Sequence, residues 1–321
     1  MHTFTQLVEL FENRFLQTLP FPQQPATLYG PCRYLLELGG KRVRPVICLM
    51  ANELFGDIND DAWRAATAVE LFHNFTLIHD DIMDKAPLRR GQPTVHAKYG
   101  LTSGILCGDV MNIYAYEELA HIKHHLPQIL SLFNKTSIEV CEGQQMDMDF
   151  ELRNDVSIDE YITMITLKTS VLLACSLKMG VLLGGATEGN SNKLYEFGKN
   201  MGIAFQLQDD YLDAFGATEK LGKQNGGDII ANKKTYLLLK AQENANATQQ
   251  REINEWLGKE GSDKVPAMLD LFRATGADKA CTDAVAHYSN MAFGCLEEAA
   301  VLSKRKEPLQ ELAIYLLQRD K

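Results

Sequence analysis

The stretch LFHNFTLIHDDIMDKAPLRRG, residues 71–91, decides how the rest of the chain is interpreted. Its apolar residues recur at helical spacing, and Asp80 and Asp84 are four residues apart, so both lie on one helix face. The C-terminal end of a helix carries partial negative charge, which disfavours each carboxylate there by about 0.3–1 kcal/mol. A cation is therefore expected beside the two aspartates. The arginine pair Arg89 and Arg90 follows after helix-breaking residues, which suggests a metal-bridged phosphate.

A second acidic helix end occurs in GIAFQLQDDYLD, residues 202–213, where Asp209 and Asp213 again stand four residues apart. One such end is commonly a solvated helix terminus, but two of them, each followed by a basic loop, point to a shared role. Helical proteins build metal sites from side chains on facing helices, so the two ends can converge across a cavity. Mg²⁺ suits them, because it prefers oxygen ligands and binds one or two carboxylates together with substrate phosphates.

A third chemical motif is GGKRVRP, residues 39–45, a tight turn that opens a helix with Lys41, Arg42 and Arg44 close to its start. Backbone amides at a helix N-terminus and three cations can cradle an anion. A solvated basic turn is the alternative interpretation of this motif on its own.

The composition argues against several classes of protein. Of 321 residues, 45% are hydrophobic, and the formal net charge of −10 without a large basic block argues against a nucleic-acid ligand. Seven scattered cysteines without a Cys-x-x-Cys pair indicate reduced, mostly buried thiols in a cytoplasmic protein. No signal peptide is expected. The apolar tract Val171–Ala186 falls short of the ~20 residues of a membrane span, so it predicts a buried core helix.

Apolar spacing of three and four predicts helices along nearly the whole chain. We expect one all-α domain, residues 1–321, with Asp60 or Asp61 capping the helix that ends in the first acidic cluster. The segment 216–233 is expected to be an ordered loop. The helices are expected at 3–19, 26–38, 102–125, 127–150, 157–188, 190–215 and after 234, with breaks near 258–261, Gly276 and Pro308.

Together these motifs resemble those of the trans-isoprenyl diphosphate synthases, the polyprenyl synthetase family. The resemblance runs from about Gly39 to Thr235 in the family's order, through GGKRVRP, HDDIMD with RRG, GQQMD, KTS, FQLQDDYLD and GKQNGGDIIANKKT. It implies an all-α helical bundle around a deep apolar cavity, a homodimer without a membrane span, and condensation of isopentenyl diphosphate with an allylic diphosphate.

The resemblance also implies a role for individual residues. Asp80, Asp84 and Asp209 would bind Mg²⁺, three ions with substrate bound, supported by Asp81, Asp210 and Asp213. The allylic diphosphate would contact Arg89, Lys168, Lys223 and Lys233. Isopentenyl diphosphate would contact Lys41, Arg44, His73 and Arg90. The residues expected to take part in catalysis are Lys168, Thr169, Gln206 and Lys223; Gln144 and Asp147 match a further motif whose role is left open.

Product length is expected to depend on bulk along the helix that ends at Asp80. Phe75 and Thr76 stand five and four residues before Asp80, and Phe72 stands eight before it. An aromatic residue at the fifth position resembles enzymes that make geranylgeranyl or farnesyl diphosphate, and the absence of an insertion in the first motif favours the twenty-carbon product. Alternatively, Phe72 and Phe75 are ordinary core aromatics.

Three other functions fit part of this pattern. A metal phosphohydrolase would use the pair His79 and Asp80, but further histidine ligands are missing and the second acidic cluster would have no role. A terpene cyclase would carry Asn and Ser or Thr in its second motif. A non-catalytic or regulatory subunit of a heteromeric synthase stays open as the alternative, although both acidic motifs are intact.

Overall fold

A computed structural model of the chain describes residues 1–216 and 226–317. Helices dominate this part of the chain, so the all-α prediction is confirmed. The residues separate into two compact units: unit 1 comprises 1–133, 175–192 and 300–309, and unit 2 comprises 134–174, 193–299 and 310–321. The expectation of a single domain over 1–321 stays a prediction.

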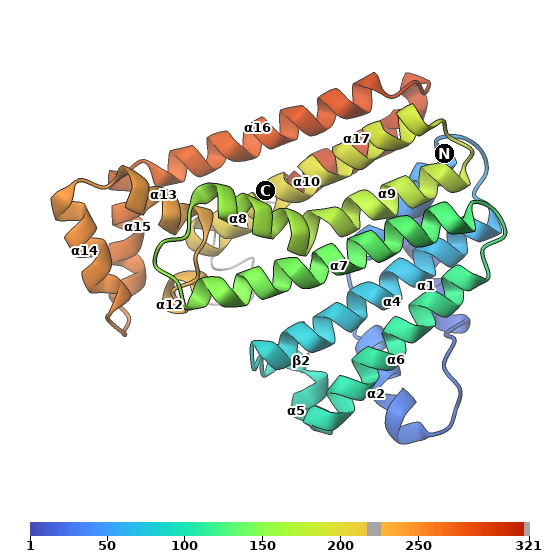
Figure 1. The fold of residues 1–321 in the computed structure, drawn as a ribbon, viewed down its shortest axis with the longest axis horizontal. Helices are drawn as coiled ribbons and strands as arrows, with labels where there is room; N and C mark the ends of the chain where they lie inside the picture. Colours follow the sequence, from blue (N-terminus) through green and yellow to red (C-terminus); the bar gives the residue numbers. More distant parts are fainter. Residues whose placement is uncertain (217–225, 318–321) are drawn as a thin grey trace. The chain divides into compact units, whose positions relative to one another are not determined.

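Unit 1 contains six α-helices and a two-stranded hairpin, followed by parts of helices that it shares with unit 2 (Figure 1). Their bounds are α1 Phe4–Gln17, α2 Ala26–Glu37, α3 Val43–Glu53, α4 Asp60–Met83, β1 Leu88–Arg89, β2 Gln92–Pro93, α5 Val95–Tyr99 and α6 Leu101–Ala120. The helices shared by both units are α7 Leu126–Glu151, α9 Val171–Leu183, α10 Glu188–Phe215 and α17 Ser303–Leu317.

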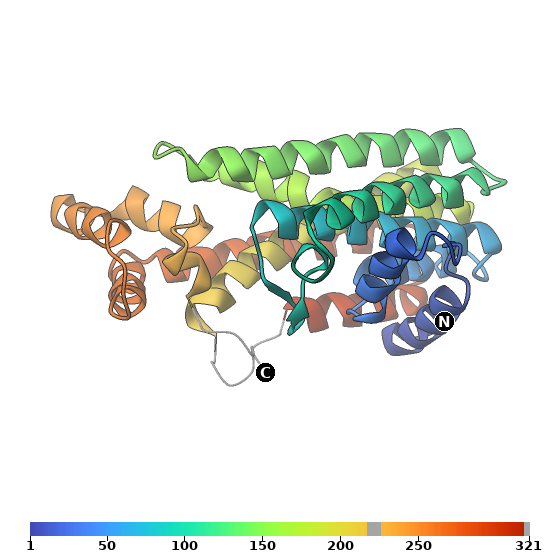
Figure 2. The same cartoon turned by 90° about the horizontal axis from the view of Figure 1, so that it is seen from below.

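In its described residues, unit 2 adds α8, a π-helical turn η1 and five helices after α10; Figure 2 shows the later ones in orange and red. Helix α13 packs against α16 and α8, and α15 packs against α14 and α16. The bounds are α8 Ile158–Ile165, η1 Thr166–Ser170, α12 Gly227–Ile230, α13 Tyr236–Asn244, α14 Ala247–Leu257, α15 Lys264–Ala274 and α16 Ala277–Glu298.

Helix α4 is the central element of unit 1, and it packs mainly against α6 and α3. Small residues make the α4–α6 approach close: a Cβ at Gly108 of α6 would stand 2.3 Å from His79 Nε2. The expected cap at Asp60 or Asp61 is wrong. Asn59 caps α4 by accepting a hydrogen bond from the Ala62 backbone, while Asp61 accepts from the backbone amides of the α6–α7 connection.

Two other expectations need correction. The expected helix 157–188 is interrupted by the π-turn η1. The break expected near Pro308 lies earlier, because Pro308 is inside α17, where Leu309, Leu312, Ala313 and Leu316 form a stripe no more than 2% exposed. Burial of that stripe outweighs the one hydrogen bond that proline removes.

The run Ile158–Leu183 is long and apolar enough for a membrane span by length and composition. However, 67% of its most apolar window is buried inside the protein, as in the core helix of a soluble protein. Five of the seven free cysteines are buried as well, which agrees with the expectation of buried thiols.

Candidate active site

The first acidic helix end lies at the C-terminus of α4, where Asp84 is the C-cap. The aspartates there have different surroundings. Asp81 is 3% exposed, and its carboxylate accepts two hydrogen bonds from Arg89, from Nε and from Nη2, both at 2.7 Å. The Arg89 guanidinium also lies 3.9 Å from Asp80 Oδ2. Arg89 is therefore the cation that the accumulation of carboxylates at this helix end requires.

The hairpin β1–β2 determines where the two arginines point. Arg90 and Gly91 form its two-residue turn with φ values of 53° and 74°, the pattern of a type I′ turn. Arg89 reaches Asp81, whereas the Arg90 guanidinium lies against Gly40: a Cβ there would stand 2.9 Å from Arg90 Nη2. The hairpin therefore places one arginine at the aspartates and the other at the GGKRVRP turn.

Arg44, His73 and Arg90 form a basic cluster in unit 1. Arg44 Nη1 lies 3.2 Å from His73 Nε2, and the buried Arg44 Nε has no hydrogen-bond partner among the described residues. Burial lowers the pKa of Arg44 to about 10. Burial holds the pKa of His73 well below its usual value, and the positive charges of Arg44 and Arg90 lower this pKa further. His73 is therefore neutral, and its Nε2 can accept a hydrogen bond from Arg44. A partly desolvated arginine with an unused donor is a ready anion site.

The second acidic helix end lies in unit 2, at the end of α10. Asp210 is 5% exposed and accepts hydrogen bonds from the Tyr161 hydroxyl, from Gln206 Nε2 at 3.2 Å and from the Tyr236 backbone amide at 3.4 Å. Burial raises its pKa to about 7 despite these donors. Asp210 thus anchors α10 to α8 and α13.

The other two aspartates of this cluster are less enclosed. Asp209 and Asp213 are partly exposed, and Asp213 Oδ2 accepts from the Asp228 backbone amide at 2.9 Å. This bond joins the end of α10 to α12.

The π-turn η1 presents Lys168 and Thr169. Lys168 Nζ lies 2.6 Å from Asp147 Oδ2 on α7, and Thr169 Oγ1 donates to Gln206 Oε1 at 3.3 Å. The hydrogen bonds Thr169–Gln206 and Gln206–Asp210 connect η1 to the second acidic cluster. A π-turn inside a helical run is frequent at functional sites.

Two glycines make room for the π-turn. A Cβ at Gly143 of α7 would stand 2.3 Å from the Lys168 backbone nitrogen, and one at Gly202 of α10 would stand 2.6 Å from Ser170 Cα. Any side chain at either position would displace η1. Neither contact is visible in the sequence, because each joins segments distant in the chain.

The remaining predicted residues are placed less specifically. Lys41 and Lys233 are exposed, and Gln144 is partly buried. Lys223 lies outside the described residues.

The residues considered for product length all lie on α4. Phe72 is 1% exposed and packs edge-on against Phe133, as a core aromatic does. Phe75 is only partly buried and contacts the rings of Phe72 and His79 at centroid distances of 5.4 and 4.9 Å. The Thr76 hydroxyl donates to the His73 carbonyl.

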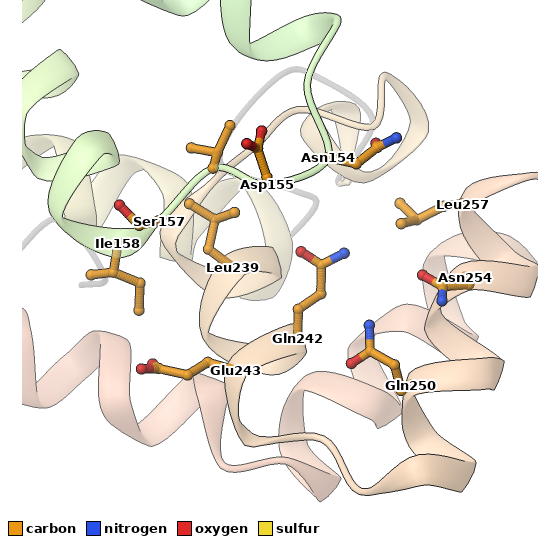
Figure 3. Close-up of a pocket in the computed structure, with 11 residues that line it drawn as sticks. Asn154, Asp155, Ser157, Ile158, Leu239, Gln242, Glu243, Gln250, Asn254 and Leu257 are labelled. Carbon is orange, nitrogen blue, oxygen red and sulfur yellow. The ribbon is translucent and has the colours of Figure 1, made fainter.

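Unit 2 also contains a pocket of about 800 Å³ between the start of α8, α13 and α14. Figure 3 shows the amides of Asn154, Gln242, Gln250 and Asn254 around it. Of the motif residues that the structure describes, none lines this pocket, so we do not assign it to the candidate active site.

The side chains at the two acidic helix ends are candidate metal ligands. Among residues 1–216 and 226–317, no three His, Cys, Asp or Glu side chains gather closely enough to hold a metal by themselves. The donors at both helix ends are nevertheless carboxylates in pairs one helical turn apart, with Asp80 in unit 1 and Asp209 in unit 2. Mg²⁺ takes one or two carboxylates, water and phosphate oxygens, so these residues fit it.

Comparison with known proteins gives a consistent result. The profile of the family described as polyprenyl synthetase matches residues 25–272. The geranylgeranyl diphosphate synthase of Methanosarcina mazei is 45% identical over 221 residues, which cover 68% of this chain and 68% of that protein. The geranylfarnesyl diphosphate synthase of Natronomonas pharaonis is 38% identical over 254 residues, 73% of this chain and 74% of that protein. A crystal structure of a geranylgeranyl pyrophosphate synthase is similar with a TM-score of 0.95 and 44% identity, and the match covers 100% of both chains.

Proposed function

The chain belongs to the polyprenyl synthetase family and is a short-chain trans-isoprenyl diphosphate synthase, and from this premise we propose its substrates' binding groups and its product. The reaction joins isopentenyl diphosphate head to tail with an allylic diphosphate and releases diphosphate. The product proposed is the twenty-carbon geranylgeranyl diphosphate, with farnesyl diphosphate as the next choice.

Isopentenyl diphosphate is proposed to bind the basic cluster of unit 1. The single observation that carries this proposal is Arg44, whose buried Nε has no hydrogen-bond partner among the described residues. A diphosphate oxygen there would satisfy that donor and accept charge-assisted hydrogen bonds from the same guanidinium. Neutral His73 adds a donor, and Arg90 and Lys41 add positive charge.

The allylic diphosphate is proposed to bind at the acidic helix ends through Mg²⁺. Three Mg²⁺ ions are proposed to be present when the substrate is bound. Asp80, Asp84 and Asp209 are the proposed ligands. When bound, Mg²⁺ would neutralise the negative charge that the leaving diphosphate gains. The side chains of Asp81, Asp210 and Asp213, already hydrogen-bonded by protein groups, are proposed to keep the ligands in place.

Lysine and arginine side chains complete the proposed diphosphate site: Arg89, Lys168, Lys223 and Lys233. They stabilise the charge that develops on the diphosphate while the allylic carbon–oxygen bond breaks. The alkene of isopentenyl diphosphate then bonds to the allylic carbon, and a proton leaves to the released diphosphate. Thr169 and Gln206 are proposed to lie near the reacting carbons, where their hydrogen bond keeps both side chains ordered.

Product length is proposed to be limited by Phe75. Its ring is only partly buried, unlike that of Phe72, and contacts with Phe72 and His79 hold it in place. A relative that is 38% identical is named for a geranylfarnesyl product, which supports the view that product length differs among similar chains. Thr76, one residue on, leaves more space than a larger side chain would.

The protein is proposed to act as a cytoplasmic homodimer. Helix α6 exposes four aliphatic side chains, Leu101, Ile105, Leu106 and Ile113, each between 42% and 64%. Covering them with a second copy would remove apolar surface from water. Light scattering of the purified protein tests this proposal: a monomeric mass at micromolar concentration would contradict it.

The proposed function is tested with purified protein, Mg²⁺, isopentenyl diphosphate and dimethylallyl diphosphate. We expect chain elongation that a chelator abolishes and that Asp84→Asn reduces at least about 100-fold. Asp283→Asn, an exposed aspartate of α16, is the matched control and should leave the rate unchanged. A folded protein without any elongation would favour the non-catalytic subunit.

A further inference from the structure

The loop between α2 and α3 has an unusual backbone. Gly39, Gly40 and Arg42 have φ values of 74°, 155° and 50°. Glycine tolerates such values, but a residue with a Cβ does not adopt them readily. Arg42 is also the N-cap of α3 and makes no side-chain capping bond. Contacts other than local ones must therefore hold this turn.

The Arg42 side chain supplies those contacts. It is fully buried, and each of its three nitrogens has a protein partner: Nη1 lies 2.5 Å from Glu70 Oε1, Nε lies 3.2 Å from Glu12 Oε1, and Nη2 donates to the Leu36 carbonyl at 2.8 Å. The turn is thus fixed to α1, α2 and α4 at once. The Arg42 side chain has no exposed surface and a protein partner at each nitrogen, so we infer that it does not contact a substrate.

Glu70, the partner of Arg42, links this turn to the basic cluster of Arg44, His73 and Arg90. It is 3% exposed and also accepts from Asn74 Nδ2 at 2.9 Å, so its position on α4 is fixed. His73 precedes Asn74 on the same helical turn, and its Nε2 contacts Arg44 Nη1. The Arg42–Glu70 pair therefore holds the loop against the part of α4 that carries His73.

We propose that Arg42, through its buried pair with Glu70, is a positioning residue of the isopentenyl diphosphate subsite. This inference rests on the proposed function. Of the three cations in GGKRVRP, Arg42 is withdrawn from substrate and maintains the left-handed turn between Lys41 and Arg44. The turn sets the direction of both neighbours and leaves Arg44 Nε available for a phosphate oxygen.

The test compares steady-state kinetics of Arg42→Met, Arg42→Lys and Glu70→Gln well below their unfolding temperatures. A misplacement of about 1 Å can cost up to about 100-fold. We expect the KM for isopentenyl diphosphate to rise at least about tenfold in Arg42→Met and Glu70→Gln, while the KM for the allylic substrate changes less than about twofold. Arg42→Lys should recover part of the loss, because it keeps a charge for Glu70.

The matched control is Arg33→Gln. Arg33 also holds a loop in unit 1, by donating to the carbonyls of Phe21 and Pro22, so its loss should lower stability without changing the KM for isopentenyl diphosphate. If Arg42→Met does not fold, Glu70→Gln alone decides the outcome. An unchanged ratio of the two KM values in the folded variants would overturn the positioning role. Condensation by the wild-type protein in the same assay tests the proposed function separately.

Discussion

Substitution of Gly143 by alanine is expected to damage the reaction through the π-turn. The added Cβ would stand 2.3 Å from the Lys168 backbone nitrogen, whereas ordinary contacts begin at 3.4 Å. Either α7 or η1 must therefore move by about 1 Å. Because Asp147 is on α7 and Lys168 is on η1, the movement also stretches their 2.6 Å contact.

The expected magnitudes follow from this displacement. Overpacking costs about 1–3 kcal/mol of stability, and replacing a helical glycine by alanine returns about 0.5–1 kcal/mol. A net loss of about 0–2.5 kcal/mol leaves the protein folded. A displacement of about 1 Å in Lys168, which is proposed to bind diphosphate, is expected to lower kcat by about 10- to 100-fold. Chemical denaturation and initial rates at saturating substrates measure the two effects.

Two glycine variants separate the local effect from a general loss of stability. Gly180→Ala makes a comparable clash, with its Cβ 2.1 Å from the Cys48 carbonyl in unit 1, and should lose stability with a smaller change in kcat. Gly294→Ala in α16 meets no atom within 4 Å and should be neutral or slightly stabilising. Wild-type kcat in Gly143→Ala would refute the role assigned to the π-turn.

Three further outcomes are expected. Phe75→Ala should lengthen the product by at least one five-carbon unit, checked by chromatography of the dephosphorylated alcohols; an unchanged length contradicts the proposal that Phe75 limits product length. Tyr161→Phe removes a hydrogen-bond donor to buried Asp210 and should lower the free energy of unfolding, measured with denaturant, by about 1–3 kcal/mol. An unchanged free energy of unfolding would mean that this hydrogen bond does not stabilise the protein. The folded pKa of His73 is depressed, so below about pH 6.5 the unfolded chain takes up a proton that the folded protein does not. The free energy of unfolding should therefore decrease as the pH falls, and in the wild type this decrease should be steeper than in His73→Asn by up to about 1.4 kcal/mol per pH unit. Parallel plots of unfolding free energy against pH for the two proteins would contradict this.

Local patterns in the sequence were sufficient for the helices and for the acidic helix ends. Asp80 and Asp84 are one turn apart at the end of α4, and the positive charge expected there is Arg89. The GGKRVRP turn could be identified as basic, and the family resemblance left Arg42 out of the substrate contacts, but the partners of the Arg42 side chain could not be predicted. Arg42 is buried while Lys41 is exposed, and this difference depends on Glu70, 28 residues later.

Features that depend on distant segments could not be predicted. The run 157–188 has uninterrupted apolar spacing, and the π-turn within it lies against Gly143 and Gly202, where a side chain would clash with it. No motif marks Tyr161 as the partner of Asp210, because the two are 49 residues apart. The hairpin turn at Arg90 and Gly91 was missed although a glycine there is a recognisable signal.

The most direct test of the central claim is incubation of the purified protein with Mg²⁺, isopentenyl diphosphate and farnesyl diphosphate. Consumption of isopentenyl diphosphate and product length are measured together, with a chelator control. We expect metal-dependent addition of one isopentenyl unit and accumulation of geranylgeranyl diphosphate. A folded protein that consumes no isopentenyl diphosphate from this or any shorter starter would contradict the account, and continued elongation past twenty carbons would contradict its product length.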